Sequence, residues 1–474
     1  MWRRIESWVH LHEAVLLILI FTVILRIPSL FEPYWYGDEG IYLTIGQAIN
    51  KGERLYQDIH DNKPPLLYVM AAVAGGYEFW FKFITLIWMV GVVYLFWKLS
   101  AEFFENKKPV VAATLVFAIL TSVPFIEGNI ANAELYFLAA TVGATYLILK
   151  KKPAFVAGMI LGISGLFKIP ALLEIMAWPV VWFFEGKWFR KSLTLGMGAA
   201  VIMGLSMVYF ASQGTLSRYL AASGFQNISY VSSWTAPAGI VGTLGGRFLV
   251  MVVILGLVEL FRKQLGKRGV IILVWGVVGL FAALLSGRPY PHYLLQITPV
   301  ASLAIATLIW GKWSERIASV GLGIFIVVAF LKFNFYTYPV TSYYTNFASY
   351  VTGAKSRDEY FRWFGQDVTL DYKIAEIVVL GTTPNERIFV WGDRPVIYAL
   401  SRRLPVGRYT TKYHILDFKA EKETEELLSQ GLAKYIVVTD EKSKLVGLSE
   451  LLTDNYIKVW ENGGYQVYRL WKKF

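Results

Sequence analysis

The feature that most constrains this chain is a series of apolar blocks separated by polar loops. With their flanks these blocks approach the roughly 20 residues that a helix needs to cross about 30 Å of hydrocarbon. Of the 474 residues 55% are apolar and only 17% are charged, against about a quarter charged in a soluble domain. A soluble core can bury one such block, but not about ten. We predict an α-helical polytopic membrane protein with about 11 transmembrane helices, near residues 13–30, 79–99, 110–123, 135–149, 154–166, 171–184, 195–210, 248–261, 270–285, 293–310 and 320–335.

The positive charge is concentrated in alternate loops between these blocks. The net charge is +12, and the cationic loops hold Arg3 and Arg4; Lys98, Lys107 and Lys108; Lys150, Lys151 and Lys152; Lys187, Arg190 and Lys191; Arg262, Lys263, Lys267 and Arg268; and Lys312 and Arg316. Cytosolic loops of membrane proteins carry such an excess of Lys and Arg. The pattern places the N-terminus in the cytoplasm and the C-terminal segment outside the cell membrane, and it disfavours a nucleic-acid partner.

The composition changes after Pro339, where long apolar runs end. We therefore divide the chain into a transmembrane domain, residues 1–337, and a small extracytoplasmic α/β domain, residues 338–474. About 135 residues are enough for one such domain. Apolar runs predict short strands at 387–391, 396–399, 434–438, 456–460 and 465–470, with a helix near 420–430.

The first extracytoplasmic loop, residues 31–63, is long and polar. Isoleucines at four-residue spacing predict a helix from about Glu39 to Asn50, with Gly52 as its stop, lying along the membrane surface. Pro64 and Pro65 then open a short helix at 66–74.

Adjacent carboxylates, Asp38 and Glu39, follow the aromatic residues Tyr34, Trp35 and Tyr36 where the first span leaves the bilayer. One interpretation is structural, with Asp38 as the N-cap of the following helix and Glu39 in its first turn. The alternative is catalytic, because partial desolvation at the interface raises a carboxylate pKa toward the range of a general base.

Two lysines are candidate phosphate ligands. Lys63 stands beside a predicted helix N-terminus, which is a ready anion site. Lys168 ends a span on the side opposite the cytosolic loops, with no acidic residue after it before Glu174. The alternative for both is an ordinary lysine that extends to the interface.

Two further loops hold polar candidates. The loop at 124–133 contains Glu127 and Asn132 and is followed by Glu134; the two glutamates are seven residues apart and would share a face if helical. An ionisable group at membrane depth is a functional candidate, although Glu134 in a first turn is also structurally ordinary. Farther on, Arg288, His292 and Tyr293 combine cations that bind phosphate with an interfacial tyrosine.

The sequence supports no cofactor. There is no cysteine, and the five histidines form no zinc motif. Walker loops, dinucleotide-binding turns and nucleophile elbows are also absent from the sequence. We predict no metal site; a divalent cation is compatible with the chemistry, but no motif supports one.

Taken together, these segments resemble the GT-C glycosyltransferases, in particular the branch of protein O-mannosyltransferases and aminoarabinose transferases. The likeness rests on Gly37–Tyr42, Asn62–Leu66, Ala133-Glu134, Pro291–Leu295 and Val390–Asp393. It covers nearly the whole chain in topology, and the first loop is its specific part. An arginine that often follows Asp-Glu in aminoarabinose transferases is replaced here by Gly40-Ile41-Tyr42, which puts a lipid A acceptor in doubt.

This resemblance implies an inverting transfer of a sugar from a polyprenyl-phosphate-linked donor to an acceptor on the outer membrane face. When the roles of the family's residues are transferred to the matching positions of this sequence, Asp38 is the general base. Glu39 and Glu134 are further catalytic candidates. The phosphate ligands are Lys63, Lys168, Arg288 and His292. The donor and acceptor pocket adds Tyr36, Tyr42, Glu127, Asn132 and Tyr293. We expect Asp38, Lys63, Glu134 and His292 to converge on one cavity at the outer membrane border.

Other functions remain open at this point. A transporter or flippase of lipid-linked sugars is the main alternative, although we find no repeated pair of broken helices. A lipid-sugar polymerase or ligase would lack the paired motifs of the first loop. The sugar, the polyprenyl chain and the acceptor, whether protein, glycolipid or glycan, are not identified by the sequence.

Overall fold

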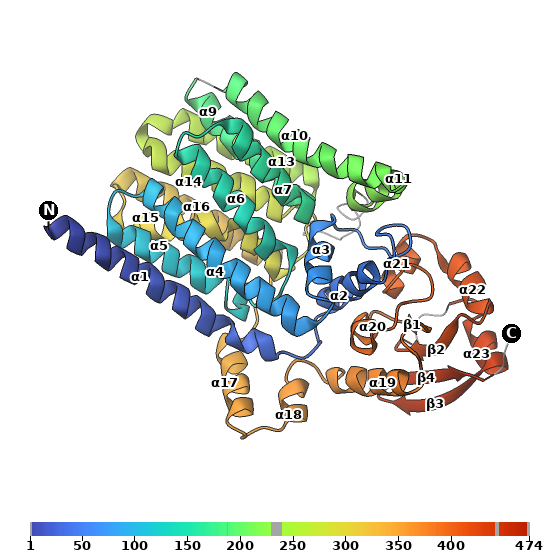
Figure 1. The fold of residues 1–474 in the computed structure, drawn as a ribbon. Coiled ribbons are helices and arrows are strands. Elements are labelled where there is room, and N and C mark those ends of the chain that lie inside the picture. The colour runs from blue at the N-terminus through green and yellow to red at the C-terminus, as the bar shows by residue number, and fades with distance from the viewer. Residues whose placement is uncertain (1, 187, 229–238, 441–444, 472–474) are drawn as a thin grey trace. The chain divides into compact units, whose positions relative to one another are not determined.

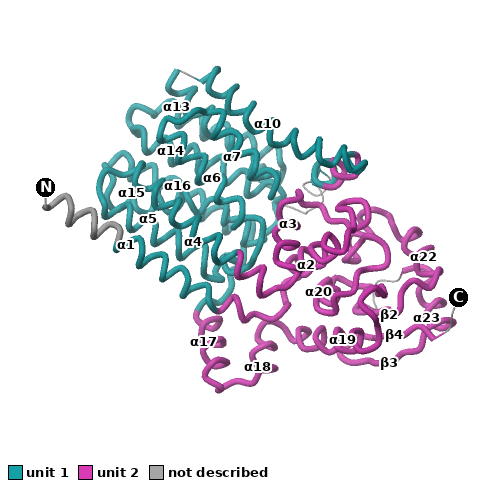
Figure 2. The backbone as a smooth tube through the Cα atoms, viewed as in Figure 1, with its two compact units in different colours: residues 1–27, 85–216, 223–340 teal, residues 28–84, 217–222, 341–474 magenta. Residues whose placement is uncertain are grey.

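The computed structural model describes residues 2–186, 188–228, 239–440 and 445–471. Lys187, one of the loop cations used above, lies outside these residues. The described chain forms two compact units (Figure 2), unit 1 from residues 1–27, 85–216 and 223–340 and unit 2 from residues 28–84, 217–222 and 341–474. The predicted boundary at 337/338 lies close to the last of these limits. The first loop, which we predicted with the membrane domain, groups instead with the C-terminal residues.

Unit 1 is built of helices (Figure 1). They are α1 (Trp2–Arg26), most of α4 (Glu78–Phe103), α5 (Lys107–Leu120), η2 (Pro124–Ile126), α6 (Ala133–Leu149), α7 (Ala154–Phe167), α8 (Ile169–Leu172), η3 (Leu173–Met176), α9 (Ala177–Phe184), α10 (Phe189–Ser212), η5 (Ile240–Gly242), α13 (Leu244–Leu260), α14 (Arg262–Ala283), η6 (Pro291–Ile297), α15 (Thr298–Trp310) and α16 (Trp313–Lys332). Small residues allow close packing: a Cβ atom on Gly158 of α7 would lie 2.0 Å from the Leu195 carbonyl oxygen of α10.

Six of the described helical segments are long and apolar enough to cross a membrane: 13–31, 78–103, 189–212, 262–283, 291–310 and 313–332. Three apolar segments, 133–149, 154–167 and 169–184, are shorter. The protein is thus a multi-pass membrane protein, and the predicted count of 11 spans is not confirmed. The reason is length, since α5 and α7 have 14 residues each and α6 and α13 have 17 each, below the roughly 20 that a perpendicular crossing requires.

Unit 2 joins the first loop to a small α/β domain. Its helices are α2 (Gly37–Asn50), α3 (Leu66–Val73), α11 (Leu216–Leu220), α17 (Val340–Val351), α18 (Arg357–Arg362), α19 (Val368–Leu380), α20 (Val396–Ser401), α21 (Lys412–Asp417), α22 (Glu421–Ser429) and α23 (Leu448–Asn455). The turns η1 (Ile27–Phe31) and η4 (Ala221–Phe225) lie where the chain passes between the units. The predicted helices at 39–50, 66–74 and 420–430 are confirmed.

A mixed four-stranded sheet forms the core of the C-terminal domain (Figure 1). Strands β1 (Arg387–Trp391), β2 (Ala433–Val438), β3 (Tyr456–Asn462) and β4 (Tyr465–Leu470) lie in the order β1-β2-β4-β3, with β1 and β2 parallel and the other pairs antiparallel. The hairpin between β3 and β4 turns at Gly463 and Gly464, both with positive φ, as a two-residue turn of type I′ requires. These four strands are confirmed.

Helices pack on both faces of the sheet. Alternate strand residues face one or the other of these helical layers. Ile388, Val390, Tyr435 and Val437 pack in one cluster with Ile374 of α19 and Ile397 of α20. Phe389, Trp391, Ile436 and Val438 pack in another with Ile415 of α21 and Leu428 of α22. This alternation follows from the period of two along a strand, because successive side chains point to opposite faces.

The predicted strand at 396–399 is wrong, because these residues form α20. Four apolar residues do not separate a strand from a buried helix. Here Pro395 stands at the N-cap position, and α2 packs closely on this helix: a Cβ atom on Gly40 would lie 2.7 Å from the Val396 nitrogen, and the Gln47 side-chain amide donates to the Ala399 carbonyl at 2.9 Å. Helix α2 therefore packs against α20 of the C-terminal domain, and Gly46 brings it equally close to Ala71 of α3; its placement along the membrane surface stays a prediction.

Lys82, at the start of α4, is a fully buried cation that holds the first loop together. Its Nζ lies 3.0 Å from Glu32 Oε2 and 2.8 Å from Glu39 Oε1, and all three side chains are at most 2% exposed. Glu32 also accepts hydrogen bonds from Tyr343 Oη at 2.5 Å and Trp35 Nε1 at 3.0 Å. A buried charge persists only when it is paired and hydrogen-bonded, so this cluster ties α2 and α17 to the beginning of α4.

We predict that Lys82→Met lowers the free energy of unfolding by about 3–5 kcal/mol, because it leaves buried carboxylates without their counter-charge. Thermal unfolding of the purified protein in detergent measures the effect. Lys373→Met is the matched control, since Lys373 and Glu376 form a pair with side chains more than half exposed, and it should leave the melting temperature unchanged. Equal melting temperatures for the two variants would refute the role of Lys82.

Candidate active site

The carboxylates of Asp38 and Glu39 point to different surroundings, although the residues are adjacent. Helix α2 begins at Gly37, and Tyr36, the residue at the N-cap position, makes no side-chain capping bond. Asp38 therefore is not the N-cap, contrary to the structural interpretation above. Its side chain is 33% exposed, whereas Glu39 is buried against Lys82. Successive residues of a helix are rotated by about 100°, which separates the two carboxylates.

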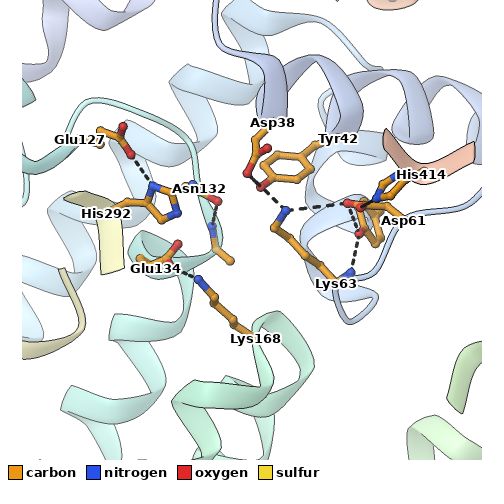
Figure 3. Close-up of polar contacts among 12 residues, drawn as sticks. Asp38, Tyr42, Asp61, Lys63, Glu127, Asn132, Glu134, Lys168, His292 and His414 are labelled. Atoms are coloured by element: carbon orange, nitrogen blue, oxygen red, sulfur yellow. Dashed lines mark hydrogen bonds and ion pairs between the residues drawn. The ribbon is translucent and has the colours of Figure 1, made fainter. Parts of the chain in front are cut away.

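Asp38 and Lys63 form the centre of a polar cluster in unit 2 (Figure 3). Asp38 Oδ2 accepts a hydrogen bond from Tyr42 Oη at 3.0 Å and lies 3.3 Å from Lys63 Nζ. Lys63 Nζ also lies 4.8 Å from the centre of the Tyr42 ring and 3.9 Å from Asp61 Oδ2. Its side chain is 18% exposed. The lysine is thus held by charges and an aromatic face, yet it is open to an anion.

Backbone contacts fix the position of Lys63. Its N–H donates to Tyr68 Oη at 3.1 Å, and its carbonyl accepts from Tyr56 Oη at 2.8 Å. Tyr68 Oη in turn donates to Asp61 Oδ2 at 2.6 Å. Because Tyr68 lies on the first turn of α3, the helix that follows the two prolines sets the place of the lysine.

A second polar cluster lies in unit 1 (Figure 3). Glu134, 1% exposed in the first turn of α6, forms a short ion pair with Lys168, which ends α7. Lys168 Nζ also lies 3.9 Å from the centre of the Tyr293 ring. The sequence offered no acidic partner near Lys168. The fold supplies one from 34 residues earlier.

His292 belongs to the same unit and contacts the loop before α6. Its Nδ1 forms a short bond with Glu127 Oε2, and both side chains are buried. Glu127 has a φ of 64° and lies outside any helix, so the condition under which Glu127 and Glu134 would share a helical face is not met. Asn132 instead caps α6, accepting from the Ala133 N–H at 2.9 Å.

The predicted site residues thus fall into two groups, one in each unit. Asp38, Glu39, Tyr36, Tyr42 and Lys63 belong to unit 2; Glu127, Asn132, Glu134, Lys168, Arg288, His292 and Tyr293 belong to unit 1. That the two groups line one cavity stays a prediction. Within the described ranges, no group of three or more His, Asp or Glu side chains is arranged to hold a metal ion.

Sequence reasoning missed Asp61 and His414 in the unit 2 cluster. Asp61 is 1% exposed and its Oδ1 lies 3.3 Å from His414 Nε2. Asp61 carried a usable signal, since it stands two residues before Lys63 in a segment already singled out. His414 carried none, because it comes from α21 in the C-terminal domain.

No protein-family model and no curated protein sequence matches this chain. Among solved structures, the apo form of ArnT from Cupriavidus metallidurans has a TM-score of 0.58 at 12% identity, and the form bound to undecaprenyl phosphate has a TM-score of 0.55 at 11% identity. Both matches cover 98% of this chain and 98% of ArnT. An Archaeoglobus fulgidus oligosaccharyltransferase matches at 14% identity with a TM-score of 0.47, over 98% of this chain and 74% of that one. The chain therefore has the GT-C fold, as seen in the aminoarabinose transferase ArnT.

We predict that Lys168→Met destabilises the protein by about 3–5 kcal/mol, because the buried Glu134 carboxylate then has lost its cation. The double variant Glu134→Gln with Lys168→Met should recover much of this loss, which a double-mutant cycle on unfolding in detergent quantifies. Lys150→Met, which removes a lysine that is 40% exposed at the other end of α6, is the control and should have little effect. Additive losses from the two substitutions would contradict the pairing.

Proposed function

We propose that this protein is an inverting glycosyltransferase that moves a sugar from a polyprenyl-phosphate-linked donor to an acceptor. The observation that supports this proposal most directly is the ion pair between Asp38, which is partly exposed, and Lys63 in unit 2. A general base and a cation are the two groups that the reaction needs. The fold supports the same proposal, since ArnT has this fold and has been solved with undecaprenyl phosphate bound.

Each group has one task in this chemistry. Asp38 takes the proton from the acceptor nucleophile as that atom attacks the anomeric carbon of the sugar. The bond from the anomeric carbon to the phosphate oxygen breaks on the opposite side, so the configuration inverts. The lipid phosphate leaves with one more negative charge, and the Lys63 ammonium stabilises that charge as it develops. No nucleotide is needed, because the lipid phosphate is itself the leaving group.

The other candidates keep the roles that the family resemblance implies. We assign Lys168, Arg288 and His292 to the donor phosphate and Glu134 to organising the donor or acceptor. Tyr36, Tyr42, Glu127, Asn132 and Tyr293 are assigned to the substrate pocket. Glu39 has a different role in our proposal from the catalytic one that we first assigned, because its contact with Lys82 makes it an anchor for α2.

We predict that Asp38→Asn abolishes sugar transfer while donor binding persists, and that Lys63→Met weakens donor binding itself. The amide keeps the shape of the carboxylate but cannot accept the proton, whereas methionine removes the charge that attracts the phosphate. Release of lipid phosphate from a lipid-linked sugar, followed with the protein in liposomes, measures transfer.

Asp454→Asn is the matched control, since Asp454 is an exposed residue of α23, and it should transfer at the normal rate. Undiminished transfer by Asp38→Asn would remove Asp38 from the mechanism. Movement of the intact lipid-linked sugar across the liposome membrane, with none of it consumed, would replace the proposal by a flippase. Mass spectrometry of surface glycans in a deletion strain would identify sugar and acceptor together.

We also propose that the N-terminus is cytoplasmic and that the C-terminal domain is extracytoplasmic, on the support of the alternating loop charges. The absence of cysteine from the sequence makes this directly testable. We predict that Ser429→Cys, at an exposed position of α22, reacts with a membrane-impermeant maleimide on intact cells. Asn106→Cys, exposed in a loop before α5, should react only after permeabilisation. The reverse pattern would invert the topology.

A further inference from the structure

A histidine from the C-terminal domain lies against the loop that carries Lys63. His414 is on α21, is 1% exposed, and places its Nε2 3.3 Å from Asp61 Oδ1 (Figure 3). A second imidazole, that of His60, and the ring of Phe418 are centred 5.9 Å and 6.1 Å from its ring. Among the described residues, Asp61 is the carboxylate within ion-pair distance of this imidazole.

The two carboxylate oxygens of Asp61 have different contacts. Oδ2 accepts from Tyr68 Oη at 2.6 Å and lies 3.9 Å from Lys63 Nζ. Oδ1 is buried and makes no hydrogen bond of good geometry among the described residues, and neither do the two ring nitrogens of His414. Burying a carboxylate oxygen without a donor is costly, and a small rotation of the imidazole turns the 3.3 Å contact into a hydrogen bond.

Asp61 matters because it shares a lysine with Asp38. Lys63 Nζ lies 3.3 Å from Asp38 Oδ2 and 3.9 Å from Asp61 Oδ2. When the Asp61 carboxylate accepts hydrogen bonds from other donors, it attracts the Lys63 ammonium less strongly. Tyr68 is such a donor to Oδ2, and His414 is placed to become the donor to Oδ1 after the small rotation of its ring.

We propose that His414 is a positioning residue of the phosphate-binding cluster, which acts through Asp61 to set how firmly Lys63 is held and hence how well it meets the lipid phosphate. The inference rests on the proposed function, and it adds a residue of the C-terminal domain to the binding of the donor. The histidine itself touches neither substrate nor reacting atoms in this scheme.

Protonation of His414 should make binding of the donor phosphate depend on pH. Burial lowers the pKa of His414, and Lys63 acts in the same direction, whereas Asp61, Asp417 and Asp38 oppose it. With the imidazole neutral, Asp38, Asp61 and Lys63 together carry one negative charge. With the imidazole protonated, Asp61 has a cation of its own, the group is neutral, and an anionic phosphate is bound more readily. The hydrogen bond from His414 to Asp61 acts at either protonation state, and donor affinity should gain further from the charge of His414 on the acid side of its pKa.

The test measures binding of undecaprenyl phosphate to the full-length protein in detergent from about pH 8 down to about pH 5, because burial moves the charge change of His414 toward the acid end of the ordinary histidine range. His414→Phe removes both the hydrogen bond and the charge. His414→Gln keeps a donor toward Asp61 but cannot be protonated. Asp371→Asn is the matched control, because Asp371 is a fully buried carboxylate of the same domain that pairs with Arg394 and touches none of these residues.

We predict that the dissociation constant of His414→Phe, divided by that of Asp371→Asn, is about 3 at pH 8 and rises toward about 10 as the pH falls into the range in which His414 takes up a proton, within the usual size of coupling between sites. Taking this ratio removes the phosphate's own titration, which is common to both proteins. For His414→Gln the ratio should be near 1 at about pH 8 and should rise only at low pH, because the amide replaces the donor but not the charge.

A ratio that does not change with pH would reduce His414 to a packing residue and overturn the inference. A His414→Gln ratio equal to that of His414→Phe at high pH would overturn the hydrogen bond to Asp61. Lys63→Met separates this outcome from failure of the proposed function. If that variant binds undecaprenyl phosphate normally, the phosphate site itself is wrong; if it does not bind and the His414 ratio stays at 1, only the role of His414 fails.

Discussion

The buried ammonium of Lys82 is the interaction on which the arrangement of the first loop depends. An ion inside a protein must be paired, because its desolvation costs several kcal/mol or more. Lys82 meets this need with Glu32 and Glu39, residues from either side of the turn into α2. The rotation of α2 is thereby set, and the residue before Glu39, Asp38, is turned toward Lys63 and solvent. One carboxylate anchors the helix, and its neighbour is left partly exposed beside Lys63.

Unit 2 shows why the first loop and the C-terminal domain form one compact body. Gly40 allows α2 to approach α20 closely, Tyr343 of α17 bonds to Glu32, and His414 of α21 lies against Asp61. Each contact supports a residue within a few positions of Asp38 or Lys63. Charged groups in partly buried sites respond strongly to such neighbours, since the local dielectric is low. The C-terminal domain therefore contributes to the electrostatic environment of Asp38 and Lys63.

Local patterns predicted the elements whose signals are local. The isoleucine spacing of 39–50, the proline pair before α3 and the apolar runs of β1 to β4 were sufficient, and those elements are confirmed. The run at 396–399 failed because four buried residues look alike in either conformation and only packing against α2 and α19 decides between them. The count of 11 spans is not confirmed for a related reason: apolar content identifies a membrane segment, but several of the described helices are shorter than a perpendicular crossing requires.

By itself the sequence determined that the chain is a membrane protein, that its charge alternates between loops, and that Asp38 and Lys63 are the residues of the first loop to examine. Composition and periodicity carry such information because they act through each segment's own contact with lipid or water. Only the tertiary structure decided that Glu39 is an anchor, that Lys168 pairs with Glu134, and that Asp61 and His414 meet beside Lys63. These partners are 34 or more residues apart in the chain, and long-range charge pairing leaves no periodic signal in a single sequence.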